Sequence, residues 1–163
     1  MRKAIVILVG LAILVLVNHS IYTREKLLTD GDVVVLRLAP VDPRSLMQGD
    51  YMALRFQIEG DVGARVRDES PHNGHVVLAL DERGVGAFAR IDDGTPLAAN
   101  EVRMRYRLRE KRIKFATNAF FFQEGHARLY ENARFGEFRV GRDGESILTG
   151  MRDGELALLG PGK

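Results

Sequence analysis

The sequence contains no cysteine and no tryptophan. The absence of cysteine excludes disulfides, thiolate nucleophiles, iron–sulfur clusters and zinc sites with cysteine ligands. An excess of charge of one sign is lacking too. There are 24 basic and 22 acidic residues, and this net charge of +2 gives no indication of nucleic-acid binding. The chain does have 17 glycines, which indicate many turns.

Polar side chains are missing from residues 4–17, which read AIVILVGLAILVLV. As a helix this run spans roughly 21 Å, and the uncharged residues after it extend the helix to the ~30 Å of a bilayer core. The run ends without the small residues of a cleavage site, so we expect an uncleaved anchor over 1–23 and not a removed signal peptide. Because Arg2 and Lys3 precede the run, the positive-inside rule places the N-terminus in the cytoplasm. The body, residues 24–163, is then expected outside the inner membrane, held by a single span.

The body alternates apolar and polar residues with the period of two that is typical of β-strands. Turns at short spacing favour an antiparallel sheet, a sandwich or an open barrel over βαβ units. Apolar residues at helical spacing predict one short helix over 123–134, whereas 59–74 is expected to be a long exposed loop. The predicted fold is therefore mainly β with one short helix, preceded by one transmembrane helix. Strands are expected at 33–39, 51–58, 76–80, 85–91, 101–110, 137–140, 145–149 and 155–159.

Residues 49–56, GDYMALRF, resemble the motif after which the bacterial GDYXXLXY domain family is named. The matching residues are Gly49, Asp50, Tyr51 and Leu54. Phe56 replaces the final tyrosine, and both the proline-rich approach at 40–46 and the sequence FFQEG at 121–125 are similar to the family as well. The resemblance implies a membrane-associated protein without an established biochemical role. It also implies a polytopic membrane protein as partner, and it carries over no catalytic residue.

The loop before Tyr51 is the first candidate binding surface. Pro40 and Pro43 restrict its backbone, and a glycine supplies a positive φ near its end. Two interpretations stay open. The loop is either a fold signature that shapes the first hairpin or a binding loop for a peptide or a membrane-protein partner. Its candidate binding residues are Asp42, Arg44, Gly49, Asp50 and Tyr51.

The strand predicted at 101–110 carries the second candidate surface. Its apolar residues are expected to face inward and its arginines outward, and four like charges on one face repel one another unless they are partnered. A solvated face interleaved with acids from a neighbouring strand explains this pattern. Contact with anionic lipid headgroups or an acidic partner, on an edge strand, is the functional alternative. The arginines are Arg103, Arg105, Arg107 and Arg109, of which the first three are the binding candidates.

A serine followed by Gly-Asp resembles the nucleophile region of bacterial signal peptidases, which are also membrane-anchored β proteins. Ser45 would be the nucleophile, and Lys111 or Lys114 would be the base, which must be desolvated to lower its pKa. The residues after Ser45 differ from that family, and the serine stands too close to Gly-Asp. We therefore expect no catalytic residue.

Two other patterns have a structural explanation. His72 and His75 supply half of a metal site, so no metal and no cofactor are expected. The aromatic run 120–122 is expected to pack in the core, with Phe121 covering the short helix; contact of Phe121 with the membrane or a partner is the alternative.

These patterns together predict a membrane-anchored, non-catalytic interaction or assembly module of the bacterial envelope that binds a polytopic membrane protein. A signal-peptidase-like Ser/Lys hydrolase and an anion- or lipid-headgroup-binding domain are the two alternatives. Nucleic acid is not an expected partner for a domain outside the cytoplasm.

Overall fold

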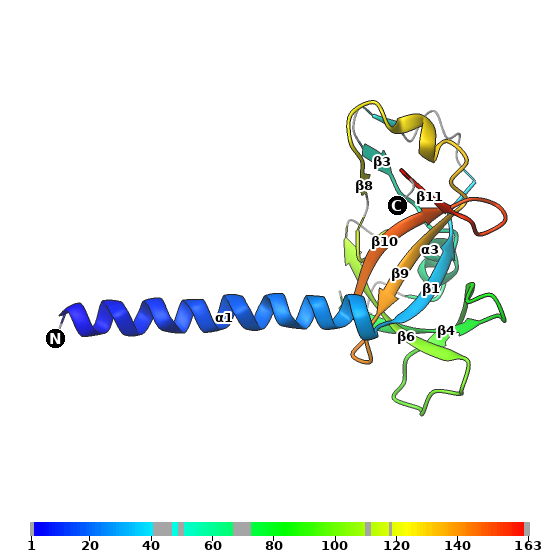
Figure 1. The fold of residues 1–163 in the computed structure, drawn as a ribbon. Coiled ribbons are helices and arrows are strands. Elements are labelled where there is room, and N and C mark those ends of the chain that lie inside the picture. Colours follow the sequence, from blue (N-terminus) through cyan, green and yellow to red (C-terminus); the bar gives the residue numbers. More distant parts are fainter. Residues whose placement is uncertain are drawn as a thin grey trace.

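The computed structural model describes residues 2–40, 47–48, 51–66, 73–109, 112–117 and 119–161. One long helix leads into a β-rich body (Figure 1). The elements in chain order are α1 (Arg2–Asp30), β1 (Asp32–Arg37), β2 (Met47–Gln48), β3 (Tyr51–Ala53), α3 (Ile58–Gly63), β4 (Asn73–Leu80), β5 (Gly86–Ile91), β6 (Glu101–Arg109), β7 (Arg112–Phe115), β8 (Ala119–Phe121), the 3₁₀ helix η1 (Ala127–Tyr130), β9 (Phe135–Val140), β10 (Ser146–Arg152) and β11 (Leu158–Leu159).

The helix α1 is long and apolar enough to cross a membrane. Its apolar segment projects from the body, and none of that segment is buried (Figure 1). The helix continues beyond Thr23 to Asp30, through the polar residues that follow the apolar run.

The body consists of curled antiparallel sheets, which confirms the predicted fold class. Two of them have four strands, in the orders β1-β9-β10-β11 and β5-β4-β6-β7. The amide of Val35 donates to the carbonyl of Gly84 at 2.9 Å and joins these two sheets at one side. A third sheet, β2-β3-β8, has three strands.

The core lies between the two four-stranded sheets, because the alternation along each strand directs one row of apolar side chains inward. β1, β4, β6 and β9 contribute most of these side chains. The helix α3 adds Ile58 and Val62, which are four residues apart and share one helix face. Side chains that are almost completely buried include Val34, Leu36, Val76, Leu78, Met104, Tyr106, Phe115, Phe138 and Met151.

Aspartates fix the predicted turns by accepting backbone hydrogen bonds. Oδ1 of Asp81 accepts the amides of Arg83 and Val85, both at 2.8 Å, and closes the predicted β4–β5 hairpin. Asp143 and Asp153 act in the same way in the two turns that follow β9 and β10. β9, β10 and β11 lie side by side in chain order, in agreement with the strands expected at 137–140, 145–149 and 155–159.

The segment 51–58 differs from the predicted strand, although its predicted buried face is confirmed. β3 ends at Ala53, yet Met52, Leu54, Phe56 and Ile58 are all buried. Phe56 forms an isolated bridge with Leu38, so the extended chain continues without a regular ladder.

The prediction of a long exposed loop at 59–74 is wrong at both ends. Residues 58–63 form α3, and β4 begins at Asn73. The carboxylate of Glu59 accepts a hydrogen bond of 3.1 Å from the amide of Phe56, two residues before α3 begins. The fully buried side chain of Val62 packs in the core and so attaches this polar, glycine-containing helix to the body.

The helix predicted over 123–134 is reduced to the single 3₁₀ turn η1. Gly125 has a φ of +82°, which interrupts a right-handed helix. Of the apolar residues that predicted the helix, Tyr130 and Ala133 are buried, whereas Leu129 is exposed. The short helix of the body is therefore α3.

Candidate interaction surfaces

The loop with the GDY motif enters the sheet β2-β3-β8. Tyr51 is the first residue of β3, which pairs with β2 on one side and with β8 on the other. The antiparallel pairing of β2 with β3 agrees with the hairpin that the motif predicts. The other candidate residues of this loop lie outside the described part of the chain: Asp42, Arg44, Gly49 and Asp50.

Two aromatic rings, one on β3 and one on the outer strand β8, lie next to each other in that sheet. Tyr51 and Phe121 are opposite each other in the β3–β8 register, and their ring centroids are 5.8 Å apart. Phe121 is 73% exposed, so the prediction that it covers the short helix as part of the core is wrong, and its contact with the membrane or a partner stays a prediction. The prediction is right for its neighbours Phe120 and Phe122, whose rings lie 5.0 and 5.4 Å from the ring of Tyr130.

The arginine strand β6 has the predicted two faces. Val102, Met104 and Tyr106 are buried, and the arginines between them point outward. The suggestion of an edge strand is wrong, because β6 lies between β4 and β7. Its outward face is therefore flanked by side chains from both neighbouring strands.

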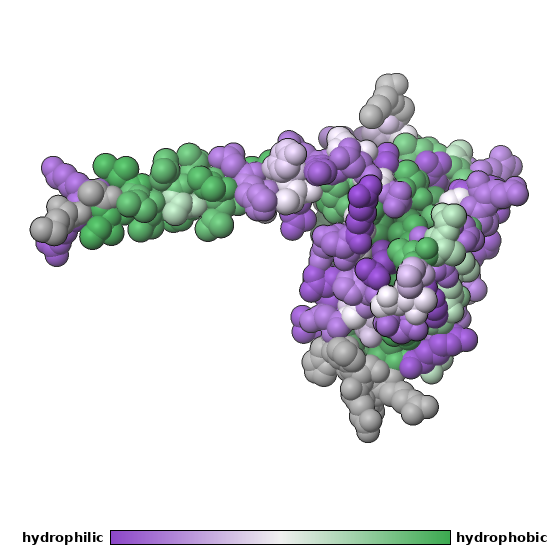
Figure 2. Space-filling model, turned by 90° about the horizontal axis from the view of Figure 1, so that it is seen from below, coloured by the Kyte–Doolittle hydropathy of each residue, from purple (hydrophilic) through white to green (hydrophobic). Residues whose placement is uncertain are grey.

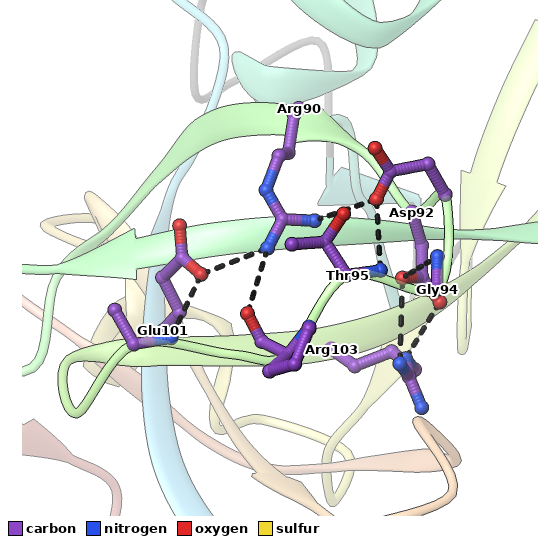
Figure 3. A network of polar contacts seen from close by, with 9 residues as sticks. Arg90, Asp92, Gly94, Thr95, Glu101 and Arg103 are labelled. Carbon is purple, nitrogen blue, oxygen red and sulfur yellow. Dashed lines mark hydrogen bonds and ion pairs between the residues drawn. The ribbon is translucent and has the colours of Figure 1, made fainter.

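The first arginine of this face is held in an ion-pair network (Figure 3). Nε of Arg103 lies 2.6 Å from Oδ2 of Asp92, whose side chain is only 12% exposed. Arg90 reinforces the same region with an ion pair of 3.0 Å to Glu101. Oδ1 of Asp92 also accepts the amide of Gly94 at 3.2 Å, so this carboxylate holds the turn after β5 in place as well.

The second arginine is tied to the turn between β9 and β10. Its guanidinium forms an ion pair with Glu145, and the Arg105 amide donates to the carbonyl of Gly144 at 2.8 Å. The acids that neutralise Arg103 and Arg105 therefore come from turns and not from the neighbouring strands, contrary to the predicted interleaving.

The other two arginines of β6 have basic neighbours. Arg107 is opposite Lys114 in the β6–β7 register, and Arg109 is opposite Arg112. Among the residues that the structure describes, no acid forms an ion pair with any of these four side chains. They line an open cavity of about 510 Å³ together with residues 115–117. We call this cavity the basic pocket.

A model of the GDYXXLXY protein family matches residues 13–151, most of the 163-residue chain. The chain belongs to the GDYXXLXY protein family. The match extends from within α1 into β10, so it covers every strand of the body except β11 and not the GDY motif alone. No curated protein and no solved structure matches the chain.

The serine–lysine pair of the hydrolase alternative is only partly covered by the described residues of this GDYXXLXY protein, so that alternative stays a prediction. Ser45 and Lys111 lie outside the described residues, and Lys114 belongs to the basic pocket. Within the described ranges, no three His, Cys, Asp or Glu residues gather in a way that would hold a metal ion. His75 packs against the turn at Gly144, and His72 is outside the described chain.

Two features of these surfaces are missed by the sequence interpretation. One is that the outward arginines of β6, which we call the arginine stripe, divide into two with acidic partners and two without. The partner acids of Arg103 and Arg105 are 11 and 40 residues away in the chain, so no local pattern reveals them. The other is the exposure of Phe121, which the sequence interpretation gives only as the alternative although the sequence carries a signal for it. Three consecutive phenylalanines in an extended segment place the middle ring on the face opposite to the other two.

Proposed function

We propose that this GDYXXLXY protein is a membrane-anchored envelope protein whose outer domain binds a polytopic membrane protein without catalysing a reaction. The anchor is α1, whose apolar segment is uncovered. Arg2 and Lys3 before that segment favour a cytoplasmic N-terminus, so the body lies outside the inner membrane.

The exposed Phe121 is the observation that carries the partner-binding proposal. The other phenylalanines of the body that the structure describes are buried or half-buried, whereas this ring stands out from the sheet beside Tyr51. β8 is the last strand of its sheet, so its outer edge can accept an extended segment from a partner. A large aromatic ring at a strand edge is typical of an interface anchor.

The proposal is tested by photocrosslinking in native membranes from a photoreactive amino acid at position 121. Position 158 is the matched control, because Leu158 is 63% exposed on the last strand of a different sheet. We expect position 121 to capture one integral membrane protein reproducibly, and Phe121→Asp to reduce its co-purification with the full chain while leaving the melting temperature unchanged.

The same membranes test the orientation. Protease added to intact spheroplasts should digest the body, and a body protected from protease would contradict the proposed location. Capture of the same proteins from positions 121 and 158 would show nonspecific crowding and would rule out a docking surface at Phe121.

A further inference from the structure

The basic pocket brings four cations together on one β-hairpin. Arg107 and Lys114 face each other across the two strands, as do Arg109 and Arg112. Like charges that are directly opposite each other destabilise a strand pair. A surface that keeps two such pairs side by side is stabilised when an anion binds between them.

The surroundings supply little compensating charge. Of the described acids, Glu59 in α3 is close enough to interact with Lys114 and Arg112, but its carboxylate also caps the amide of Phe56. The hydroxyl of Thr117 donates to the carbonyl of Ala119 at 2.8 Å. Residues 110–111, which connect β6 with β7 in the sequence, lie outside the described chain and carry one charge of each sign. The net charge of the pocket is therefore strongly positive.

The pocket lies on the side of the body from which α1 leaves. The turn 141–147 shares a cavity with Ser20 and Thr23, which follow the apolar part of the helix. The same turn binds the amide of Arg105. Arg107 and Arg109 follow on the same face, roughly 7 and 14 Å farther along the strand.

The pictures agree with this placement. In Figure 1 the yellow-green ribbon of β7 lies on the side of the body from which α1 leaves. Figure 2 shows hydrophilic residues along the side of the body that faces back along the helix. A membrane crossed by α1 would have its headgroups opposite this side.

We propose that the basic pocket binds the phosphate groups of anionic phospholipids in the membrane that α1 crosses. The proposal rests on the anchoring by α1 and not on partner docking through Phe121. Arginine binds phosphate through two parallel N–H donors, and β6 and β7 present three arginines and one lysine to a single open cavity. The body would thereby be held against the membrane at a second point, which fixes its orientation.

The experiment measures lipid retention by native mass spectrometry on the full chain in detergent, titrated with phosphatidylglycerol or phosphatidylcholine. The test variant is the double substitution Arg107→Gln with Arg112→Gln. The control is Arg83→Gln with Arg128→Gln, which removes the same charge from exposed positions outside the pocket. Basic residues on the helix, such as Arg24 and Lys26, contribute equally in every variant.

Each basic residue near an anionic surface strengthens binding about fivefold, so we expect the double variant to bind phosphatidylglycerol roughly 10- to 30-fold more weakly than the wild type. The control should stay within about twofold, and no variant should change phosphatidylcholine binding. Thermal melting checks that the double variant is folded.

Unchanged phosphatidylglycerol binding in the folded double variant would overturn the proposal. So would displacement of the lipid by low concentrations of inorganic phosphate, which would identify a site for free anions. Retained lipid binding together with loss of crosslinking from position 121 would remove the partner proposal and leave this one intact.

Discussion

The outward face of β6 contains two regions with the same residue type and opposite electrostatic environments. Arg103 and Arg105 each meet a carboxylate from a turn, whereas Arg107 and Arg109 meet Lys114 and Arg112. The alternation in the sequence predicts which side chains point outward. The alternation does not predict which charged groups contact these arginines, because the contacting residues come from distant parts of the chain. The half with ion pairs therefore contributes to the fold, and the half without an ion pair to any described acid is the one that lines the basic pocket.

The largest expected effect on stability comes from a substitution in the turn between β9 and β10, which contacts Arg105 in the half of the stripe that has ion pairs. Gly144 has a φ of +82°, and an added Cβ would lie 2.7 Å from Cδ2 of His75. The Gly144→Val substitution should lower the free energy of unfolding by about 2–4 kcal/mol, because it combines a left-handed backbone with overpacking. Urea denaturation of the full chain in detergent measures this change.

Substitutions at two other glycines distinguish the cost of the left-handed backbone from the cost of overpacking. Gly94 has a φ of +85° with open space around it, so Gly94→Val should show only the backbone cost of about 1–2 kcal/mol. Gly154 occupies the corresponding Arg-Asp-Gly turn without a positive φ and with no close neighbour, so Gly154→Val should cost less than about 0.5 kcal/mol. Equal losses at all three positions would contradict the role assigned to the turn at Gly144.

The two halves of the stripe should respond differently to loss of one charge. Arg103→Gln leaves the nearly buried carboxylate of Asp92 without its cation and should destabilise the protein by about 1–2 kcal/mol. Arg107→Gln removes repulsion from Lys114 and should leave the stability unchanged or raise it by up to about 0.5 kcal/mol. Urea denaturation of the two single variants measures both changes.

The salt dependence of stability tests whether Arg107 is repelled by its neighbours. Added sodium chloride should stabilise the wild type relative to Arg107→Gln, because it screens the repulsion that the variant has already lost. The exposed pair of Arg83 with Asp81, at 3.8 Å, provides a control in which Arg83→Gln should leave the stability unchanged within the error of the measurement. A stability loss in Arg107→Gln equal to that in Arg103→Gln would show that the unpaired half has a structural role.

The sequence predicts the β-rich fold and its strands well where alternation and turn residues agree. β6 and the β4–β5 hairpin have both signals, and both are confirmed. The short helix is misplaced because the segment around α3 is polar and rich in glycine, and only Ile58 and Val62 show its helical period. At 123–134 the apolar spacing favours a helix, but the left-handed Gly125 interrupts it.

The candidate surfaces are only partly predictable for a different reason. The spacing of the arginines gives their common face, and three phenylalanines in a strand require one ring to point away from the others. Which cations are neutralised depends on tertiary contacts, such as the one between Arg105 and Glu145, that have no local signature. The sequence therefore predicts a basic stripe, and only the structure divides it.

The smallest expected effect concerns Glu59, the acid that interacts with the unpaired half. Burial raises the pKa of Glu59 above its ordinary value near 4.5, although the Phe56 amide and the attraction of Lys114 and Arg112 oppose the shift. A carboxyl with a raised pKa in the folded state stabilises the protein fully below its unfolded pKa, and this contribution is lost as the pH rises through the folded pKa.

Glu59→Gln keeps an oxygen for the Phe56 amide, so it should raise the stability at neutral pH by less than about 0.5 kcal/mol, because solvent screens this partly exposed group. The gain should vanish below pH 4.5. It should grow when Arg112→Gln is added, because that substitution removes a cation that favours the ionised form of Glu59. Urea denaturation at neutral and acidic pH measures all three effects. If Glu59→Gln raised the stability equally with and without Arg112→Gln, the basic pocket would have no influence on Glu59. The two halves of the arginine stripe would then differ only in their direct ion pairs.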